Sequence, residues 1–96
     1  MVAKHRGLNL QGVLHHHPGV KEAACVGVKD EYWGEALAAY VVARSEGALT
    51  EAELVAFCEE RLARYKLPKS ITFIDELPRN AAGKVLRKDL REKGNA

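Results

Sequence analysis

An almost unbroken apolar segment, Ala36 to Ala43, constrains the fold of this chain more than any other feature. A run of this length suits a strand that is buried on both faces. The segment before it, Val20 to Val28, also predicts a strand, because apolar residues alternate along one of its faces. The polar turn at 29–34 separates the two segments, which together predict a hairpin.

The clearest helix follows Gly47 and begins at a capping box, in which the Thr50 hydroxyl accepts from a first-turn amide and Glu53 reaches back. An apolar stripe at helical spacing continues from there, and Lys66-Leu67-Pro68 ends it. The stripe consists of Leu54, Phe57, Cys58, Leu62 and Tyr65. This pattern predicts a helix that packs one face on the core.

Three further elements complete the expected fold. Gln11 to His17 predicts a short helix, Ser70 to Ile74 a third strand, and Leu86 to Lys93 a terminal helix with Gly94 as its cap. The element order predicts an α+β fold: a small two-layer α/β sandwich of about three main strands with helices on one side. We expect residues 1–9 to be a linker remnant or disordered, and residues 10–96 to form the domain.

Size and composition limit the possible classes of protein. The chain has 96 residues, enough for one domain, and no apolar run approaches the about 20 residues of a membrane span. No apolar stretch follows Lys4 and Arg6, so we expect no signal peptide. Cys25 and Cys58 are too few for a disulfide framework, and buried free thiols in a reducing cytoplasm are expected.

Charge is distributed unevenly along the chain. Residues 1–60 hold five basic and nine acidic side chains, whereas residues 61–96 hold ten basic and four acidic ones. A basic half of this kind indicates a polyanionic partner such as a nucleotide, coenzyme A or nucleic acid. A solvated charged surface is the alternative explanation.

The segment Leu77 to Arg87 carries the strongest functional signal. It presents Lys84 directly after Gly83, in a small polar loop that also contains the turn residue Asn80. A Walker phosphate loop is excluded, because Pro78 and Val85 occupy the positions where that motif requires a glycine and a serine or threonine. A lysine in such a loop can bring its ammonium group to a site built elsewhere.

Leu77 to Arg87 resembles the C-terminal signature of the adenylate-forming ligases, which include acyl-CoA synthetases, luciferases and the adenylation domains of peptide synthetases. Three other stretches agree with that family in order and approximate spacing, so the resemblance covers roughly residues 10 to 93. They are His17-Pro18-Gly19-Val20, then Val26 to Asp30 with Trp33-Gly34-Glu35, and Arg64 to Lys69. Within the family, the chain most resembles a fatty or aromatic acyl-CoA synthetase.

The resemblance implies a role for Lys84 as the catalytic lysine of adenylation, presented by Gly83. In such ligases a carboxylate reacts with ATP to give an acyl-adenylate and pyrophosphate, and CoA then takes the acyl group. The C-terminal domain is a mobile lid that serves both half-reactions by rotating. The N-terminal AMP-binding domain holds ATP, Mg²⁺ and the acyl group, so the isolated chain is expected to be inactive.

The resemblance also implies a coenzyme A site. Trp33, next to Gly34, and Tyr65 would flank the adenine, and Lys69 would lie near a phosphate. Leu67 departs from the family by replacing a basic residue. Packing of both aromatic rings on the core remains an open alternative. Glu35 lines the entrance to the thioester-forming site or only shapes the hairpin, and Lys29 replaces the proline that is usual in this turn.

No metal site is expected. His15, His16 and His17 point in different directions on a helix, and the two cysteines lie far apart in the sequence. A different class of function is a free-standing basic module that binds nucleic acid or another polyanion through its terminal helix. Its contacts would be Arg87, Lys88, Arg91 and Lys93. A third possibility is a regulator that occupies the lid position on another ligase.

Overall fold

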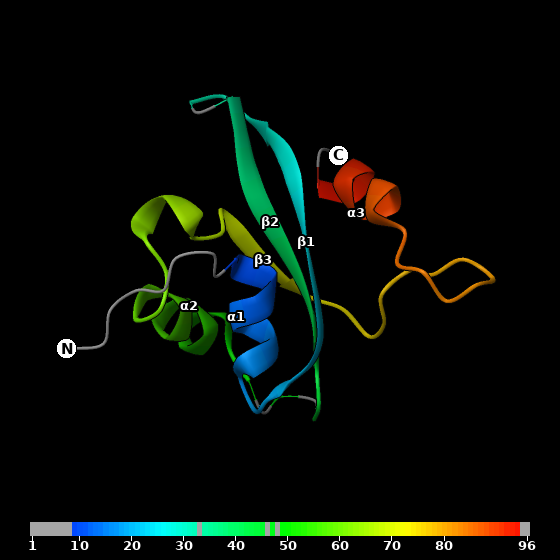
Figure 1. The fold of residues 1–96 in the computed structure, drawn as a ribbon, viewed down its shortest axis with the longest axis horizontal. Coiled ribbons are helices and arrows are strands. Elements are labelled where there is room, and N and C mark those ends of the chain that lie inside the picture. Colours follow the sequence, from blue (N-terminus) through cyan, green and yellow to red (C-terminus); the bar gives the residue numbers. More distant parts are fainter. Residues whose placement is uncertain (1–8, 33, 46, 48, 95–96) are drawn as a thin grey trace.

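The computed structural model describes residues 9–94 apart from 33, 46 and 48. Its elements are α1 (Leu10–His16), β1 (Val20–Asp30), β2 (Gly34–Ala43), α2 (Glu51–Glu59), the 3₁₀ helix η1 (Arg64–Lys66), β3 (Ser70–Phe73) and α3 (Arg87–Gly94). Figure 1 shows the sheet running through the centre of the domain with the helices beside it. The linker expected at residues 1–9 lies outside the described residues except for Asn9.

The strands form one sheet in the order β1-β2-β3. β1 and β2 pair antiparallel as a hairpin, with Cys25 opposite Ala39, and this confirms the predicted hairpin. β3 pairs parallel to β2, with Ile71 also opposite Ala39. Parallel neighbours require a crossover connection, which α2 and η1 supply. The central position of β2 explains why its sequence is apolar on both faces.

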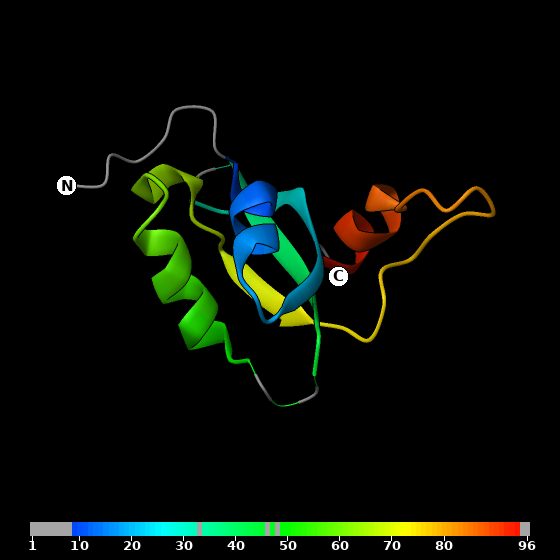
Figure 2. The ribbon, with the colours of Figure 1, turned by 60° about the horizontal axis from the view of Figure 1, so that its bottom comes forward.

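Apolar side chains cover both faces of the sheet. Ala39 and Val41 of β2 pack with α1 and α2, whereas Tyr40 and Val42 pack on the opposite face with Leu90 of α3. Figure 2 shows α1 and α2 on one side of the sheet and α3 on the other. The predicted three-stranded α/β fold is confirmed, but its helices lie on two sides instead of one.

The difference has a physical reason in the strands. β2 carries apolar residues on both faces, so a single layer of helices would leave one apolar face in water. Leu90 is the buried residue of α3, at 2% exposure. One buried position in an otherwise charged helix does not indicate in the sequence which face the helix covers.

Side-chain caps begin the first two helices. Asn9 Oδ1 accepts from the Gly12 amide at 2.7 Å, and Thr50 Oγ1 accepts from the Glu53 amide at 3.1 Å. The second contact is half of the predicted capping box. α2 ends earlier than predicted, because the Arg61 amide bonds the carbonyl three residues back, at Cys58, and Ala63 is extended. Leu62 nevertheless remains in the core.

The outer edge of β1 is occupied by side chains from α1 and α3. β1 is an edge strand, so alternate residues direct their backbone groups away from β2. The contacts are His15 Nε2 with the Ala23 carbonyl (3.1 Å), Gln11 Oε1 with the Cys25 amide (3.3 Å), Arg87 Nη1 with the Cys25 carbonyl (2.7 Å) and Arg91 Nε with the Gly27 carbonyl (3.1 Å). These contacts fix both helices to the sheet in addition to apolar packing.

Both cysteines are free thiols, and Cys58 is fully buried whereas Cys25 is half-buried. Burial raises the pKa of Cys25 to about 12 and the pKa of Cys58 to about 11. Cys58 of α2 and Cys25 of β1 both pack in the core between the sheet and the layer of α1 and α2. In the described part of the chain, no helix has the length and apolar character needed to cross a membrane.

Candidate functional site

The segment from Arg79 to Val85, here called the lysine loop, is a short hairpin that extends away from the sheet. Arg79 and Val85 form an antiparallel bridge, and the Asn80 amide donates to the Lys84 carbonyl at 3.0 Å. At its base the Leu86 amide donates to the Pro78 carbonyl at 2.8 Å. Figures 1 and 2 both show the loop projecting beyond α3 at the end of the domain farthest from α2.

Asn80 and Gly83 give the loop its shape. The Asn80 carboxamide oxygen accepts from the Ala82 amide at 2.9 Å and from the Lys84 amide at 3.0 Å. The Gly83 amide returns to the Asn80 carbonyl at 2.9 Å. Gly83 has φ +84°, a conformation that glycine adopts at little cost. The predicted turn roles of both residues are therefore confirmed.

Lys84 follows immediately and is exposed. Its backbone is held at both the amide and the carbonyl, but among the described residues its ammonium group has no hydrogen-bond or ion-pair partner. A fixed backbone with a free ammonium group suits a side chain that acts on something outside this domain.

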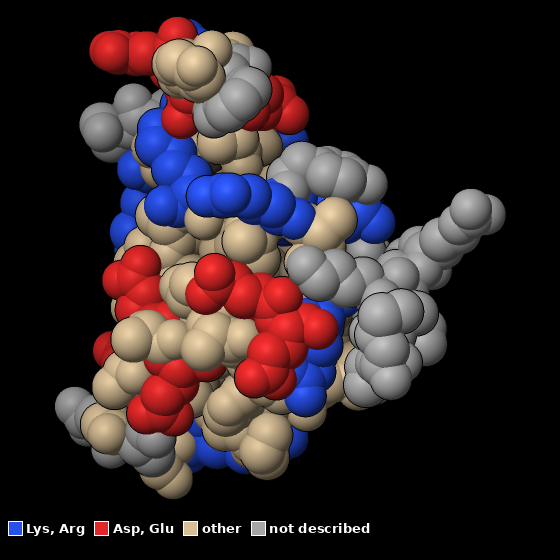
Figure 3. Space-filling model, turned by 90° about the vertical axis from the view of Figure 1, so that its left-hand side faces the viewer, with Lys and Arg blue, Asp and Glu red and all other residues tan. Residues whose placement is uncertain are grey.

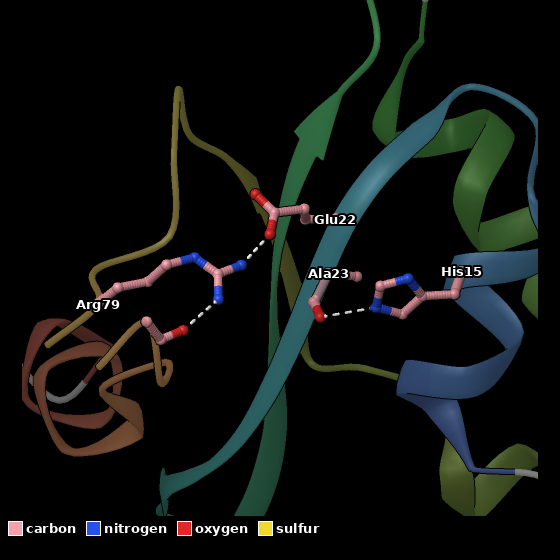
Figure 4. A network of polar contacts seen from close by, with 5 residues as sticks. His15, Glu22, Ala23 and Arg79 are labelled. Atoms are coloured by element: carbon pink, nitrogen blue, oxygen red, sulfur yellow. Dashed lines mark hydrogen bonds and ion pairs between the residues drawn. The ribbon is translucent and has the colours of Figure 1, made fainter. Parts of the chain in front are cut away.

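Arg79 connects the lysine loop to the sheet, as Figure 4 shows. Its Nη1 donates to the Gly83 carbonyl at 2.8 Å, and its Nη2 pairs with the Glu22 carboxylate on β1. Sequence reasoning did not single out either residue. The partners are 57 positions apart, and no local pattern connects an arginine in a loop to a glutamate in a distant strand.

The end of the β1–β2 hairpin carries the second group of predicted residues. Gly34 begins β2 with φ +81°, and the Tyr32 amide donates to Asp30 Oδ1 at 2.9 Å. Tyr32 itself is 82% exposed. Glu35 is exposed and lies over Gly27, where an added Cβ would come within 2.6 Å of its Oε1. Trp33 lies outside the described residues.

Lys69 is brought to this hairpin end from the start of β3. Its Nζ lies 3.2 Å from Asp30 Oδ2 and 3.4 Å from the Lys29 carbonyl oxygen. Tyr65 lies in η1, four residues before Lys69, although its side chain is outside the described part. The structure therefore groups Lys69 with Gly34, whereas Figures 1 and 2 place the lysine loop on a separate part of the surface.

A basic band crosses the face that carries α2 and η1. In Figure 3 it runs between acidic side chains at the hairpin end and acidic side chains over α2. The sequence of η1 contains the basic residues Arg64 and Lys66, and that of α2 contains Glu51, Glu53 and Glu59. A surface with this separation of charge can receive an anion beside the hairpin end.

The adjacent histidines serve local structure. His15 bonds the β1 edge, and His17 Nδ1 accepts from the Gly19 amide at 2.9 Å while its ring meets Phe57 edge-on at 4.8 Å. Over the residues that the structure describes, no three His, Cys, Asp or Glu side chains come close enough together to hold a metal ion.

Comparison with known proteins decides the family. The family model described as "AMP-binding enzyme C-terminal domain" matches residues 10–84. This chain belongs to that family. The adenylate-forming resemblance drawn from the lysine loop and the three other stretches is therefore confirmed.

The curated relatives of this AMP-binding C-terminal domain are acyl-CoA ligases. The 2-succinylbenzoate–CoA ligase of Bacillus cereus (strain ATCC 14579) is 52% identical over 83 residues, which is 86% of this chain and 17% of that protein. The same enzyme of Bacillus mycoides (strain KBAB4) matches with the same identity and coverage. The chain thus spans about a sixth of the length of these relatives.

Solved structures agree on the fold. A Mycobacterium tuberculosis fatty acyl CoA synthetase matches with a TM-score of 0.83 and 46% identity, over 88% of this chain and 17% of that one. The o-succinylbenzoate CoA synthetase of Bacillus subtilis, in complex with an acyl-adenylate intermediate, matches with a TM-score of 0.79 and 41% identity, over 86% and 17%. Both similarities confirm the predicted fold.

Proposed function

We propose that this chain is the C-terminal lid of an ATP-dependent acyl-CoA synthetase, in which Lys84 stabilises adenylation. The observation that carries the proposal is the lysine loop itself. It holds the Lys84 backbone at two points and leaves an exposed ammonium group without a described partner. The family and the names of the relatives supply the reaction class.

Adenylation joins two anions, a carboxylate and the α-phosphate of ATP. Negative charge concentrates on the reacting oxygens as they approach, so a positioned ammonium group stabilises the transition state more than the ground state. Lysine suits this role as a compact charge on a flexible stem. ATP and the carboxylate would be bound by an N-terminal AMP-binding domain, and the ammonium of Lys84 would enter that site from the lid.

Thioester formation would use the hairpin end. Lys69 contacts Asp30, which pairs with Gly34 across the hairpin, and it could exchange this contact for a phosphate of coenzyme A. Trp33 and Tyr65 are proposed to flank the adenine. The hairpin end and the lysine loop lie on separate parts of the surface (Figure 1). This separation supports the proposal that the lid rotates between the half-reactions and presents a different part of its surface in each.

We propose that Mg²⁺ binds in the N-terminal domain, where the family resemblance places ATP. The ion would neutralise phosphate charge on ATP, while this chain would contribute only the ammonium group of Lys84.

A chimera tests the proposal directly. Residues 9–94 replace the matching C-terminal residues of the Bacillus cereus 2-succinylbenzoate–CoA ligase, and each half-reaction is assayed separately. In this chimera Lys84→Ala should slow pyrophosphate release from ATP and 2-succinylbenzoate by about 100-fold or more. Thioester formation from supplied acyl-adenylate and CoA should change little.

The matched control is Lys88→Ala, which removes another exposed lysine close in sequence, on α3. It should leave both half-reactions intact. Equal loss of both half-reactions in Lys84→Ala, or no loss in either, would contradict the assignment. The 96-residue chain alone should produce no acyl-adenylate.

A polyanion-binding module is the second candidate, supported by the ten basic side chains of residues 61–96. The structure weakens it, because Arg87 and Arg91 of the terminal helix are engaged with backbone carbonyls of β1. Lys88 and Lys93 remain exposed on that helix. Retention of nucleic acid that falls steeply with salt and does not depend on Lys84 would favour this candidate.

A further inference from the structure

We infer that Arg79 is a positioning residue for Lys84, holding the lysine loop at a fixed orientation through an ion pair with Glu22. The inference deepens the proposed function and rests on it for its catalytic consequence. The physical connection itself is independent of any reaction. It consists of one guanidinium group that binds the carbonyl immediately before Lys84 and a carboxylate on the sheet.

The internal hydrogen bonds of the lysine loop fix its shape but not its direction. The Asn80 contacts and the Arg79–Val85 bridge all join residues of the loop to one another. Among the described residues, Glu22 is the one side chain outside the loop that pairs with it. Val85 at the end of the loop also packs against the apolar cluster that contains Leu77 and Leu90. Without the Arg79–Glu22 pair, the outer part of the loop could therefore pivot away from the sheet while keeping its internal hydrogen bonds.

The location of Glu22 makes it a stable anchor. It lies in β1, where the register with β2 shifts between Val20 and Glu22. Ala23, the next residue, is buried in the core, and its carbonyl is bonded by His15 of α1. Figure 4 shows how these contacts connect α1 to β1, and β1 to Arg79 and the loop. Glu22 therefore stands on a strand that is paired with β2 and bonded to α1.

The guanidinium group is suited to a double contact that lysine cannot reproduce. Its nitrogens diverge in one plane, so one donates to the Gly83 carbonyl while another meets Glu22. Misplacement of a catalytic group by about 1 Å can cost about 100-fold in rate. Lys84 adjoins the Gly83 carbonyl, so any pivot of the loop moves its ammonium group.

The first test measures order in the lysine loop of this 96-residue chain by ¹⁵N relaxation. Arg79→Gln and Glu22→Ala should each lower the amide order parameters of Gly83 and Lys84 from about 0.85 to below about 0.6. The control, Arg61→Gln, removes the exposed pair with Glu60 and should leave them unchanged. Unchanged order in both loop variants would overturn the inference.

The second test is a double-mutant cycle in the ligase chimera. Arg79→Gln should slow adenylation by about 10- to 100-fold and leave thioester formation within about twofold. Arg79→Lys should slow adenylation nearly as much, because a lysine ammonium group cannot contact the Gly83 carbonyl and Glu22 with the divergent nitrogens of a guanidinium. In the Lys84→Ala background, Arg79→Gln should have no further effect on adenylation.

The outcomes separate the two proposals. Additive loss in the double variant, or equal loss in both half-reactions, would overturn the positioning role and indicate general destabilisation. If the loop loosens in Arg79→Gln but Lys84→Ala leaves adenylation unchanged, the connection between Arg79 and Glu22 stands and the proposed function of Lys84 fails.

Discussion

The guanidinium of Arg87 donates to the backbone carbonyl of Cys25 at 2.7 Å, across 62 positions of sequence. Its second nitrogen donates to Gln11 Oε1 at 2.9 Å, and the same carboxamide oxygen accepts from the Cys25 amide. One side chain thus connects the helix after the lysine loop to the edge strand and to α1. Three elements meet at this guanidinium.

Replacement of Arg87 by alanine should lower the free energy of unfolding by about 1–2 kcal/mol. It removes two charge-assisted hydrogen bonds, while water can still reach the half-buried partners, which limits the cost. Urea denaturation followed by circular dichroism measures the change. Lys88→Ala, on the same helix, is the control and should stay within about 0.5 kcal/mol of the wild type. An Arg87→Ala variant as stable as the wild type would show that the contacts of Arg87 contribute nothing to holding α3.

Replacement of Gly83 by alanine should cost about 1 kcal/mol of stability or displace the lysine loop. The reason is the backbone alone, because φ is +84° and nothing lies within 4 Å of an added Cβ. Gly83→Asn should be milder, since asparagine tolerates this conformation better. The chemical shifts of the Ala82 and Lys84 amides, together with urea denaturation, report both effects. Equal behaviour of the two variants would contradict a backbone origin.

The two thiols should make stability fall in alkaline solution. Burial raises the pKa of Cys25 to about 12 and that of Cys58 to about 11, from an ordinary value of 9.0. The folded chain therefore keeps protons that the unfolded chain releases. This contribution is complete below pH 9.0 and is lost as the pH rises toward 11 and 12.

Urea denaturation from pH about 7 to about 10 measures this loss. The double variant Cys25→Ala/Cys58→Ala should lose less stability over the same range than the wild type, because other groups titrate equally in both chains. If stability depended on pH identically in the wild type and the double variant, the loss could not be attributed to the two thiols. Reaction of the thiols with a disulfide reagent should also be slow in the folded chain and rapid in denaturant.

Local patterns in the sequence predict most of the secondary structure. The apolar run at β2 and the turn before it predict the hairpin, and Thr50 marks the start of α2. The parallel pairing of β3 and the position of α3 depend on contacts between distant segments. Such contacts leave no periodic trace, which explains why the second helical layer was not predicted.

The same distinction applies to the candidate site. The turn roles of Asn80 and Gly83 can be predicted from the sequence because turn chemistry is local, and Lys84 follows Gly83 directly. The contacts of Arg79 with Glu22 and of Arg87 with Cys25 cannot be predicted from the sequence, because each depends on the folded sheet. The sequence therefore indicates which group acts, and the structure adds the contacts that orient it.

The side-chain contacts along β1 also affect how separate copies of this chain meet. An uncovered edge strand offers a template on which a strand of another molecule can form, and this is a common route to aggregation. Here a second strand would have to displace Gln11 and two arginines from the backbone groups of Cys25 and Gly27. At this edge, the contacts that fix α3 also protect the domain against intermolecular sheet formation.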